Sequence, residues 1–318
     1  VNLVGGQDQL VFDGGSMVVD PAGQIIGRGS RFEEAVVCLD VDVDAVSVPS
    51  DGLPVVDVSD PVNRSDHLMA PPLAPLDEVG ELYGALVLAT RDYVRKSGFT
   101  DVCLGLSGGV DSALVATVAA DALGPDRVHA VLMPSRHSSE HSVSDAEDLV
   151  SRQGLDDLTL PIEEVHQAVS GVLANAPEGE PAGLTDENLQ SRIRGVLLMA
   201  RANANGWLVL STGNKSESAV GYTTLYGDTA GAFAVIKDVT KTRVYELCRW
   251  RNAQSQELTA GLWFRRPFLT SHLRPNCGPA NATIRACPPT TCWTPFWRPI
   301  SRGTGPGPSW WPTVTPLT

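Results

Sequence analysis

The sequence of 318 residues lacks a long apolar run, an excess of basic residues and a basic leader segment. Its longest apolar stretch, 113–120, is interrupted by Thr117 and is far too short to span a membrane. The 24 Lys and Arg are outnumbered by 37 Asp and Glu, and the net charge of −13 argues against a general nucleic-acid binder. No basic segment precedes an apolar core at the start, so we identify no signal peptide. With 42% apolar residues the chain can still bury a core.

The last part of the sequence has no Asp, Glu or Lys between Leu258 and Thr318, although six Arg remain. This part also contains eleven Pro and five of the seven Trp, and no helical or alternating pattern survives that density of Pro. We therefore expect residues 254–318 to form an atypical tail, either disordered or produced by a shifted reading frame. An unusual genuine domain is the alternative.

Cysteine is sparse, and the six residues are divided between the acidic body and the tail. The spacing of the tail cysteines does not favour a zinc site, so we expect no metal there. We expect the body cysteines, Cys38, Cys103 and Cys248, to be buried reduced thiols. Reduced thiols indicate a cytoplasmic protein.

The first 50 residues predict β structure. Apolar stretches alternate with turns that contain Gly or Pro, and we expect strands at 9–12, 16–20, 25–26 and 35–41. Residues 51–78, rich in Pro, Asp and Ser, predict a linker. A helix should then begin near Glu78, because acidic residues lie in its first turn, and it should end at Gly98.

Strands and helices alternate in the following part of the chain. We expect strands at 101–106, 128–133, 158–162 and 207–211. We expect helices at 113–123, 145–153, 163–174 and 185–203, the last with Thr185 as its N-cap and Asn188 at its third helical position. This order predicts an α/β fold with an open parallel sheet and flanking helices, which binds ligands at the carboxyl ends of its strands.

The most informative motif is Ser107–Ser112 (SGGVDS), at the junction of a predicted strand and helix. Two adjacent Gly let the backbone approach a ligand closely, and the peptide N–H groups and the helix N-terminus favour a pyrophosphate. Ser107 and Ser112 can donate hydrogen bonds, and Asp111 can hold Mg²⁺ against the phosphates. The motif is neither a Walker A loop nor a dinucleotide Gly-x-Gly-x-x-Gly. An ordinary Gly-containing turn is the alternative.

This run resembles the pyrophosphate-binding loop of the N-type ATP pyrophosphatases, which include NAD⁺, GMP and asparagine synthetases and tRNA-thiolating enzymes. Further stretches resemble the NAD⁺ synthetases: 185–194 (TDENLQSRIR), 211–228 (STGNKSESAVGYTTLYGD) and 237–242 (KDVTKT). Residues 1–16 resemble the end of the nitrilase-like glutaminase domain that precedes the synthetase domain in the glutamine-dependent members. The resemblance covers about 1–253 and implies an adenine nucleotide α-hydrolase-like fold.

The activity that this resemblance implies is ATP-dependent amidation of deamido-NAD⁺ to NAD⁺. ATP would adenylate the carboxylate, and ammonia from glutamine would then displace AMP. The implied cofactor is Mg²⁺, and the implied partners are ATP, deamido-NAD⁺ and glutamine or ammonia, without nucleic acid or membrane. The intact enzyme would be a cytoplasmic homo-oligomer.

The resemblance also implies roles for individual residues, position by position. ATP would bind at Gly105, Leu106, Ser107, Gly108, Gly109, Val110, Asp111, Ser112, Met133, Arg136 and Thr212. Deamido-NAD⁺ would bind at Asn188, Glu217, Tyr222, Thr223, Thr224 and Leu225. Asp111, Asp228 and Lys241 would act in catalysis, and Asp111 and Glu217 would hold the metal. Asn188 and Glu217 also have local explanations, a satisfied first helical turn and a solvated face.

The domain organisation expected from these observations has four parts: a glutaminase-domain remnant at 1–50, a linker at 51–78, a NAD synthetase domain at 79–253 and the tail at 254–318. A nitrilase-type glutaminase uses a Glu–Lys–Cys triad, and 1–50 contains no Lys. We therefore expect the nucleophile upstream of Val1 and no glutaminase site in this chain. Two alternatives stay open: an inactive nucleotide-binding fragment, and another amide-forming N-type ATP pyrophosphatase such as GMP synthetase.

Overall fold

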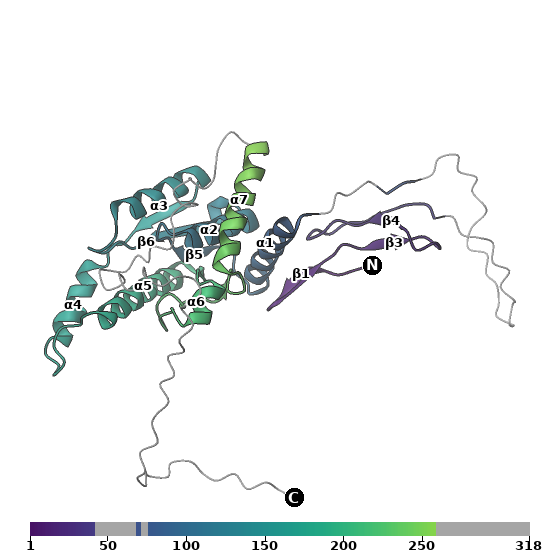
Figure 1. Cartoon of the computed structure of the whole chain (residues 1–318). Helices are drawn as coiled ribbons and strands as arrows, with labels where there is room; N and C mark the ends of the chain where they lie inside the picture. The colour runs from purple at the N-terminus through teal and green to yellow at the C-terminus, as the bar shows by residue number, and fades with distance from the viewer. Residues whose placement is uncertain (42–67, 71–75, 259–318) are drawn as a thin grey trace, which may run out of the picture. The chain divides into compact units, whose positions relative to one another are not determined.

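The structure is a computed structural model that describes residues 1–41, 68–70 and 76–258, with side chains up to Ser255. Its helices and strands are labelled in Figure 1. The expected linker and the expected tail lie almost wholly outside the described residues.

Two short antiparallel hairpins form the start of the chain. Their strands are β1 (Val4–Gln7) with β2 (Leu10–Asp13), and β3 (Met17–Val19) with β4 (Ile25–Arg28). The strands predicted at 9–12, 16–20 and 25–26 are confirmed by these pairs.

The strand predicted at 35–41 is wrong. These residues form no regular strand, and Val36 is 92% exposed. Asp40 instead makes a single pair of hydrogen bonds with Leu68. Its N–H donates to the Leu68 carbonyl and its carboxylate accepts from the Leu68 N–H, both at 2.9 Å. An apolar run becomes a strand only when a neighbouring strand pairs with its backbone N–H and C=O groups. This segment has the Asp40–Leu68 pair of hydrogen bonds and no such ladder of backbone hydrogen bonds.

Two of the three cysteines expected to be buried are buried, namely Cys103 and Cys248, whereas Cys38 is exposed. Cys38 lies in the segment that does not form the predicted strand, so no sheet covers it. Burial raises the pKa of the Cys103 thiol to about 12 and that of the Cys248 thiol further still. Both buried thiols are therefore protonated and unreactive at neutral pH.

A five-stranded parallel sheet forms the centre of the larger α/β part (Figure 1). Its strands are β5 (Val102–Gly105), β6 (Val128–Leu132), β7 (Asp156–Thr159), β8 (Leu208–Ser211) and β9 (Phe233–Ala234). Their order is β7-β6-β5-β8-β9, and every neighbouring pair is parallel. The predicted open parallel sheet is confirmed, and β9 was not predicted because two residues give no periodic signal.

Helices connect these strands. They are α1 (Glu78–Lys96), α2 (Val110–Leu123), the 3₁₀ turn η1 (Pro125–Arg127), α3 (Glu140–Gln153), α4 (Glu163–Leu173), α5 (Leu184–Asn205), α6 (Lys215–Val220) and α7 (Lys241–Leu258). The predicted α1 is confirmed, and the Asp77 side chain caps it by accepting the Gly80 N–H at 2.6 Å. In the part of the chain that the structure describes, no helix is both long enough and apolar enough to cross a membrane.

The two faces of the sheet have separate cores. Adjacent strand residues point to opposite faces, so Cys103 of β5 belongs to one buried cluster and Leu104 to the other. Val209 and Leu210 of β8 are divided in the same way. Residues of α1, α2, α3 and α7 complete the Leu104 cluster, and residues of α5 complete the Cys103 cluster. The sheet is therefore covered by helices on both faces.

The N-cap of α5 differs from the prediction. The cap is Gly183, with φ 56° and ψ −128°, and not Thr185. A positive φ is easy for Gly and strained for a β-branched residue, so the turn is made where Gly stands. Thr185 consequently lies inside the first turn, and Asn188 comes just after it.

A partly buried ionic network joins α1, α2 and α7. Asp121 of α2 accepts a hydrogen bond from the Tyr83 hydroxyl at 2.5 Å and two from Arg251, at 2.7 Å from Nε and 3.0 Å from Nη2. The side chains of Arg251 and Asp121 are 13% and 21% exposed. Trp250 packs against Tyr83 with ring centroids 5.2 Å apart. Helix α7 is thus fixed to the fold by charge and by aromatic packing together.

We predict that Asp121→Ala lowers the free energy of unfolding by about 3 kcal/mol, because Arg251 loses its carboxylate partner while it remains largely buried. The control is Glu78→Ala, which removes the ion pair to Arg243 from a side chain that is 80% exposed, and we expect it to cost less than about 1 kcal/mol. Urea denaturation measures both. Equal losses in the two variants would contradict the role given to Asp121.

Candidate functional site

The loop after β5 is closed by its own serines. The Ser112 hydroxyl donates to the Gly109 carbonyl at 3.0 Å, and the Ser107 N–H donates to the Ser112 hydroxyl oxygen at 3.3 Å. Gly109 is the N-cap of α2, and no side chain caps that helix. The N-terminus of α2 therefore presents backbone N–H groups and the positive end of its dipole at the carboxyl edge of the sheet. Such a terminus is suited to an anion.

Gly108 is required at its position for two separate reasons. Its φ is +75°, which favours glycine. A Cβ built on it would also lie 2.0 Å from the Ser142 carbonyl oxygen in α3. The loop backbone is therefore pressed against the start of α3, and the predicted need for Gly in the SGG run is explained by this contact.

Asp111, in the first turn of α2, lies at the centre of a polar cluster. Its carboxylate accepts a hydrogen bond from the Asn214 amide at 3.0 Å and forms a short ion pair with the Lys241 ammonium. The side chains of Asp111 and Lys241 are only 16% and 20% exposed. The structure thus brings together Asp111 and Lys241, which are far apart in the sequence. We call Asp111, Asn214 and Lys241 the carboxylate cluster.

Asn214 was missed by the sequence analysis, although its signal is present. It is fully buried and is the N-cap of α6, where it forms a capping box with Glu217. The Asn214 side chain accepts the Glu217 N–H at 3.0 Å, and the Glu217 carboxylate accepts the Asn214 N–H at 3.1 Å. An Asn followed by Glu three residues later, and by Gly221 at the helix end, is a recognisable helix signature.

Glu217 lies within electrostatic reach of the carboxylate cluster. Burial raises the pKa of its carboxyl above the ordinary value, and the neighbouring carboxylates of Asp111 and Asp228 raise it further. The Asn214 N–H and the Lys241 ammonium act in the opposite direction. Three predicted site residues, Asp111, Glu217 and Lys241, therefore belong to one electrostatic unit.

The loop 224–228 is held by side chains of α5. The Thr224 hydroxyl donates to the Asn188 side-chain oxygen at 2.8 Å, and the Ser191 hydroxyl accepts the Asp228 N–H at 3.0 Å. Arg192 donates to the Leu225 carbonyl at 3.2 Å. Asn188 and Thr224 were predicted to act at the same site, and the structure joins them.

Ser191 and Arg192 were missed as functional positions, although they lie in the TDENLQSRIR stretch. Their spacing of three and four residues from Asn188 places all three side chains on one side of α5. This helical spacing was the signal that could have identified them.

The remaining predicted residues lie at the same edge of the sheet with different exposure. Met133 is buried at the end of β6, and its Cε lies 3.2 Å from the position of a Cβ on Gly105. Arg136 is turned toward α4, where it is 3.6 Å from Glu163. Partly buried residues are Thr212 and Thr223, and exposed residues are Tyr222, Leu225 and Asp228.

Two carboxylates, Asp111 and Glu217, flank Asn214 and are the side chains that could supply oxygen ligands to a cation. Within the described ranges, no three His, Cys, Asp or Glu side chains converge as a metal site. A cation at this place would need ligands from a substrate as well.

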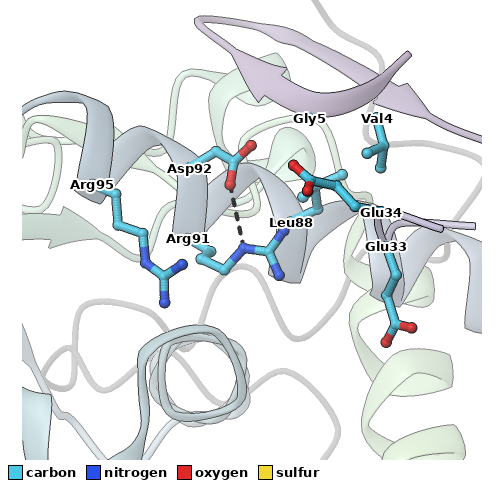
Figure 2. A pocket seen from close by; sticks show the side chains of 8 residues that line it. All are labelled: Val4, Gly5, Glu33, Glu34, Leu88, Arg91, Asp92 and Arg95. Atoms are coloured by element: carbon cyan, nitrogen blue, oxygen red, sulfur yellow. Dashed lines mark hydrogen bonds and ion pairs between the residues drawn. The ribbon is translucent and has the colours of Figure 1, made fainter. Parts of the chain in front are cut away.

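A separate hollow of about 500 Å³ lies between β1, the 33–34 segment and α1 (Figure 2). Acidic and basic side chains face each other across it, and Arg91 is paired with Asp92 at 3.3 Å. None of its lining residues belongs to the loop, the carboxylate cluster or the 224–228 segment. The carboxyl edge of the sheet, where the chemistry-bearing groups converge, is therefore the candidate active site.

A parallel sheet with a Ser/Gly loop at its carboxyl edge and helices on both faces defines an adenine nucleotide α-hydrolase-like domain. A glutamine-dependent NAD⁺ synthetase from Acinetobacter baumannii, solved in complex with ADP, has a TM-score of 0.73 at 41% identity, over 85% of this chain and 47% of that one. An NH₃-dependent NAD synthetase from Campylobacter jejuni has a TM-score of 0.51 at 32% identity, over 57% of this chain and 76% of that one. Residues 82–265 match the family described as NAD synthase, and the chain belongs to this family.

Curated relatives agree with this assignment. A glutamine-dependent NAD(+) synthetase of Thermotoga maritima is 46% identical over 290 residues, which covers 86% of this chain and 50% of the relative. A protein of the same name from Rhodobacter capsulatus is 48% identical over 256 residues, covering 80% and 43%. The chain thus spans about half the length of the curated relatives that it matches.

We predict a pH-dependent effect of Glu217→Gln. The folded-state pKa of Glu217 is raised, so its contribution to stability is fully present below the ordinary pKa of a Glu and is lost as pH rises through the folded-state pKa. Gln keeps the acceptor that the capping box needs but does not ionise. The variant should therefore gain stability relative to the natural chain as the pH is raised from about 4 toward neutrality.

Urea denaturation at several pH values in this range measures the difference. The control is Glu147→Gln at an exposed position of α3, measured at the same pH values. A Glu217→Gln difference that is flat over the range, or that falls with rising pH, would contradict the assignment.

Proposed function

We propose that this chain provides the synthetase part of an enzyme that converts deamido-NAD⁺ to NAD⁺ at the expense of ATP, with nitrogen from glutamine in the intact enzyme. The observation that carries the proposal is the carboxylate cluster, which sets a carboxylate and an ammonium at the N-terminus of α2. Adenylation of a carboxylate develops negative charge on phosphoryl oxygens, and this is the place where the chain can stabilise it.

ATP binding is assigned to the loop Gly105–Ser112, with Met133 and Arg136 on the nucleoside side and Thr212 as a further contact. The uncapped N-terminus of α2 supplies N–H donors for the phosphates, and Gly108 lets the backbone turn without a side chain in the way. The ADP named in the Acinetobacter baumannii complex supports an adenine nucleotide as the ligand of this fold. Lys241 is then placed to hold phosphoryl oxygens or the reacting carboxylate.

Magnesium is the cation that the residues fit. Asp111 and Glu217 offer carboxylate oxygens, and Mg²⁺ is usually bound by one or two carboxylates together with water and substrate phosphates. When bound, the ion would neutralise phosphate charge. Asn214 keeps the two carboxylates in place, because it is hydrogen bonded to both residues.

Deamido-NAD⁺ is assigned to the opposite side of the site, along α5 and the loop it holds. Asn188 and Thr224 are bonded to each other, so either can be oriented by the other toward a ligand. The exposed Tyr222 and Leu225 provide surface for the dinucleotide. Asp228, whose main chain is fixed by Ser191 and Ser211, is placed to act near the reacting carboxylate.

We also infer a cytoplasmic, homo-oligomeric enzyme. The buried thiols of Cys103 and Cys248 suit a reducing compartment.

We predict that Asp111→Asn lowers ATP-dependent turnover by roughly 100-fold or more, since it removes a carboxylate that faces the phosphates. The turn keeps its backbone donors, so the thermal midpoint should fall by only a few degrees. The control is Asp126→Asn on the exposed η1 turn, which should leave turnover within twofold. Turnover of Asp111→Asn close to that of the control would overturn the assignment of the loop.

A second prediction concerns substrate choice. Exchange of labelled pyrophosphate into ATP should require deamido-NAD⁺, because only the reversible adenylation of a bound carboxylate returns pyrophosphate to ATP. Xanthosine monophosphate and aspartate serve as the comparison substrates. Exchange that either of them supports, without deamido-NAD⁺, would assign the chain to another amide-forming reaction, and a chain with no exchange at all would be an inactive fragment.

A further inference from the structure

Helix α5 positions much of the candidate dinucleotide side of the site, yet no side chain caps its own N-terminus. Asn188, Ser191 and Arg192 hold the loop 224–228, and Arg194 donates to the Met133 carbonyl at 3.0 Å. The N-cap, Gly183, offers no side chain to the first turn. The position of that turn therefore depends on contacts from outside α5.

The contact that the structure provides comes from α4. His166 is 4% exposed, and its Nε2 lies 2.6 Å from Asp186 Oδ1 in the first turn of α5. A carboxylate oxygen only accepts, so the imidazole N–H is the donor. The other oxygen of Asp186 accepts from Gln190 at 2.9 Å, and this side chain is buried as well. The Asp186 carboxylate is thus fixed from both α4 and α5.

Helix α4 also reaches the nucleoside side of the site. Glu163, one turn before His166, is 3.6 Å from Arg136 and accepts from Gln167 at 2.9 Å. The same helix therefore contacts a residue assigned to ATP and the helix that carries Asn188. Its contact with α5 is the shorter of the two and the less exposed.

We propose that His166 is a positioning residue for the dinucleotide: through Asp186 it fixes the first turns of α5, and so the place of Asn188 and of the Thr224 loop. It acts through these groups and does not touch the substrate. The inference rests on the proposed function for its ligand, deamido-NAD⁺. It predicts an effect on binding of this one substrate and little effect on the chemistry once both substrates are bound.

The test compares His166→Leu with His166→Gln in the full chain. Leu leaves the partly buried Asp186 oxygen without its donor, and the loss of one such bond commonly changes an equilibrium about tenfold. We expect the KM for deamido-NAD⁺ in the pyrophosphate-exchange assay to rise about tenfold, with the KM for ATP and the maximal rate within twofold. Gln carries an amide N–H near the place of Nε2 and should restore the KM to within threefold of the natural chain.

The matched control is Val172→Gly. Val172 lies on the same helix and is 72% exposed, so Gly destabilises α4 without touching Asp186. It should lower the thermal midpoint but leave every KM unchanged. A general weakening of α4 would instead raise the KM for deamido-NAD⁺ in both variants, and that result would overturn the proposal.

Amide hydrogen exchange of 184–190 provides a readout that needs no substrate. It should quicken at least tenfold in His166→Leu, recover in His166→Gln and stay unchanged in Val172→Gly. Unchanged exchange, or an unchanged KM in an active enzyme, would overturn the positioning role. If the natural chain shows no deamido-NAD⁺-dependent exchange of pyrophosphate, the proposed function fails, and the amide exchange still decides whether His166 fixes α5.

Discussion

The interaction on which the site depends is the bonding of Asp111 to Lys241 and Asn214. It joins the first turn of α2, the loop before α6 and the first residue of α7, which no short-range contact would bring together. Two nearby acidic residues, Glu217 and Asp228, make the ammonium of Lys241 necessary even without a ligand, because carboxylates so close to each other are unfavourable when nothing compensates them. The ammonium of Lys241 thus offsets negative charge that the fold itself brings together.

The larger elements of the fold were predictable because their signals are local and strong. The buried strand 101–106, the SGGVDS junction and the helix that begins near Glu78 follow from apolar runs, Gly and capping residues within a few positions of one another. The prediction of a strand at 35–41 was wrong because its signal was not local. A strand needs a neighbouring strand to pair with, and composition does not show whether one is present. The prediction of Thr185 as the N-cap of α5 was wrong because the helix begins two residues earlier. Gly183, which adopts a positive φ, is the N-cap instead.

The site was predictable residue by residue only where a motif or a resemblance named the residue. Asp111, Lys241, Asn188 and Thr224 were named in this way, and the structure brings Asp111 into contact with Lys241 and Asn188 into contact with Thr224. Asn214 and His166 were not found, because their importance lies in bonds to residues distant in the sequence. The sequence alone does not show which partners their side chains bind.

Helix α7 contributes both to the carboxylate cluster and to the stability of the fold. Its first residue, Lys241, is the cation of the carboxylate cluster, while Trp250 and Arg251, further along the same helix, hold the fold together through Tyr83 and Asp121. The anchor thus lies downstream of the functional residue. Fraying from the far end must therefore release the anchor before it reaches the cation, so the Trp250 and Arg251 contacts that hold the fold are lost before the charge at the site.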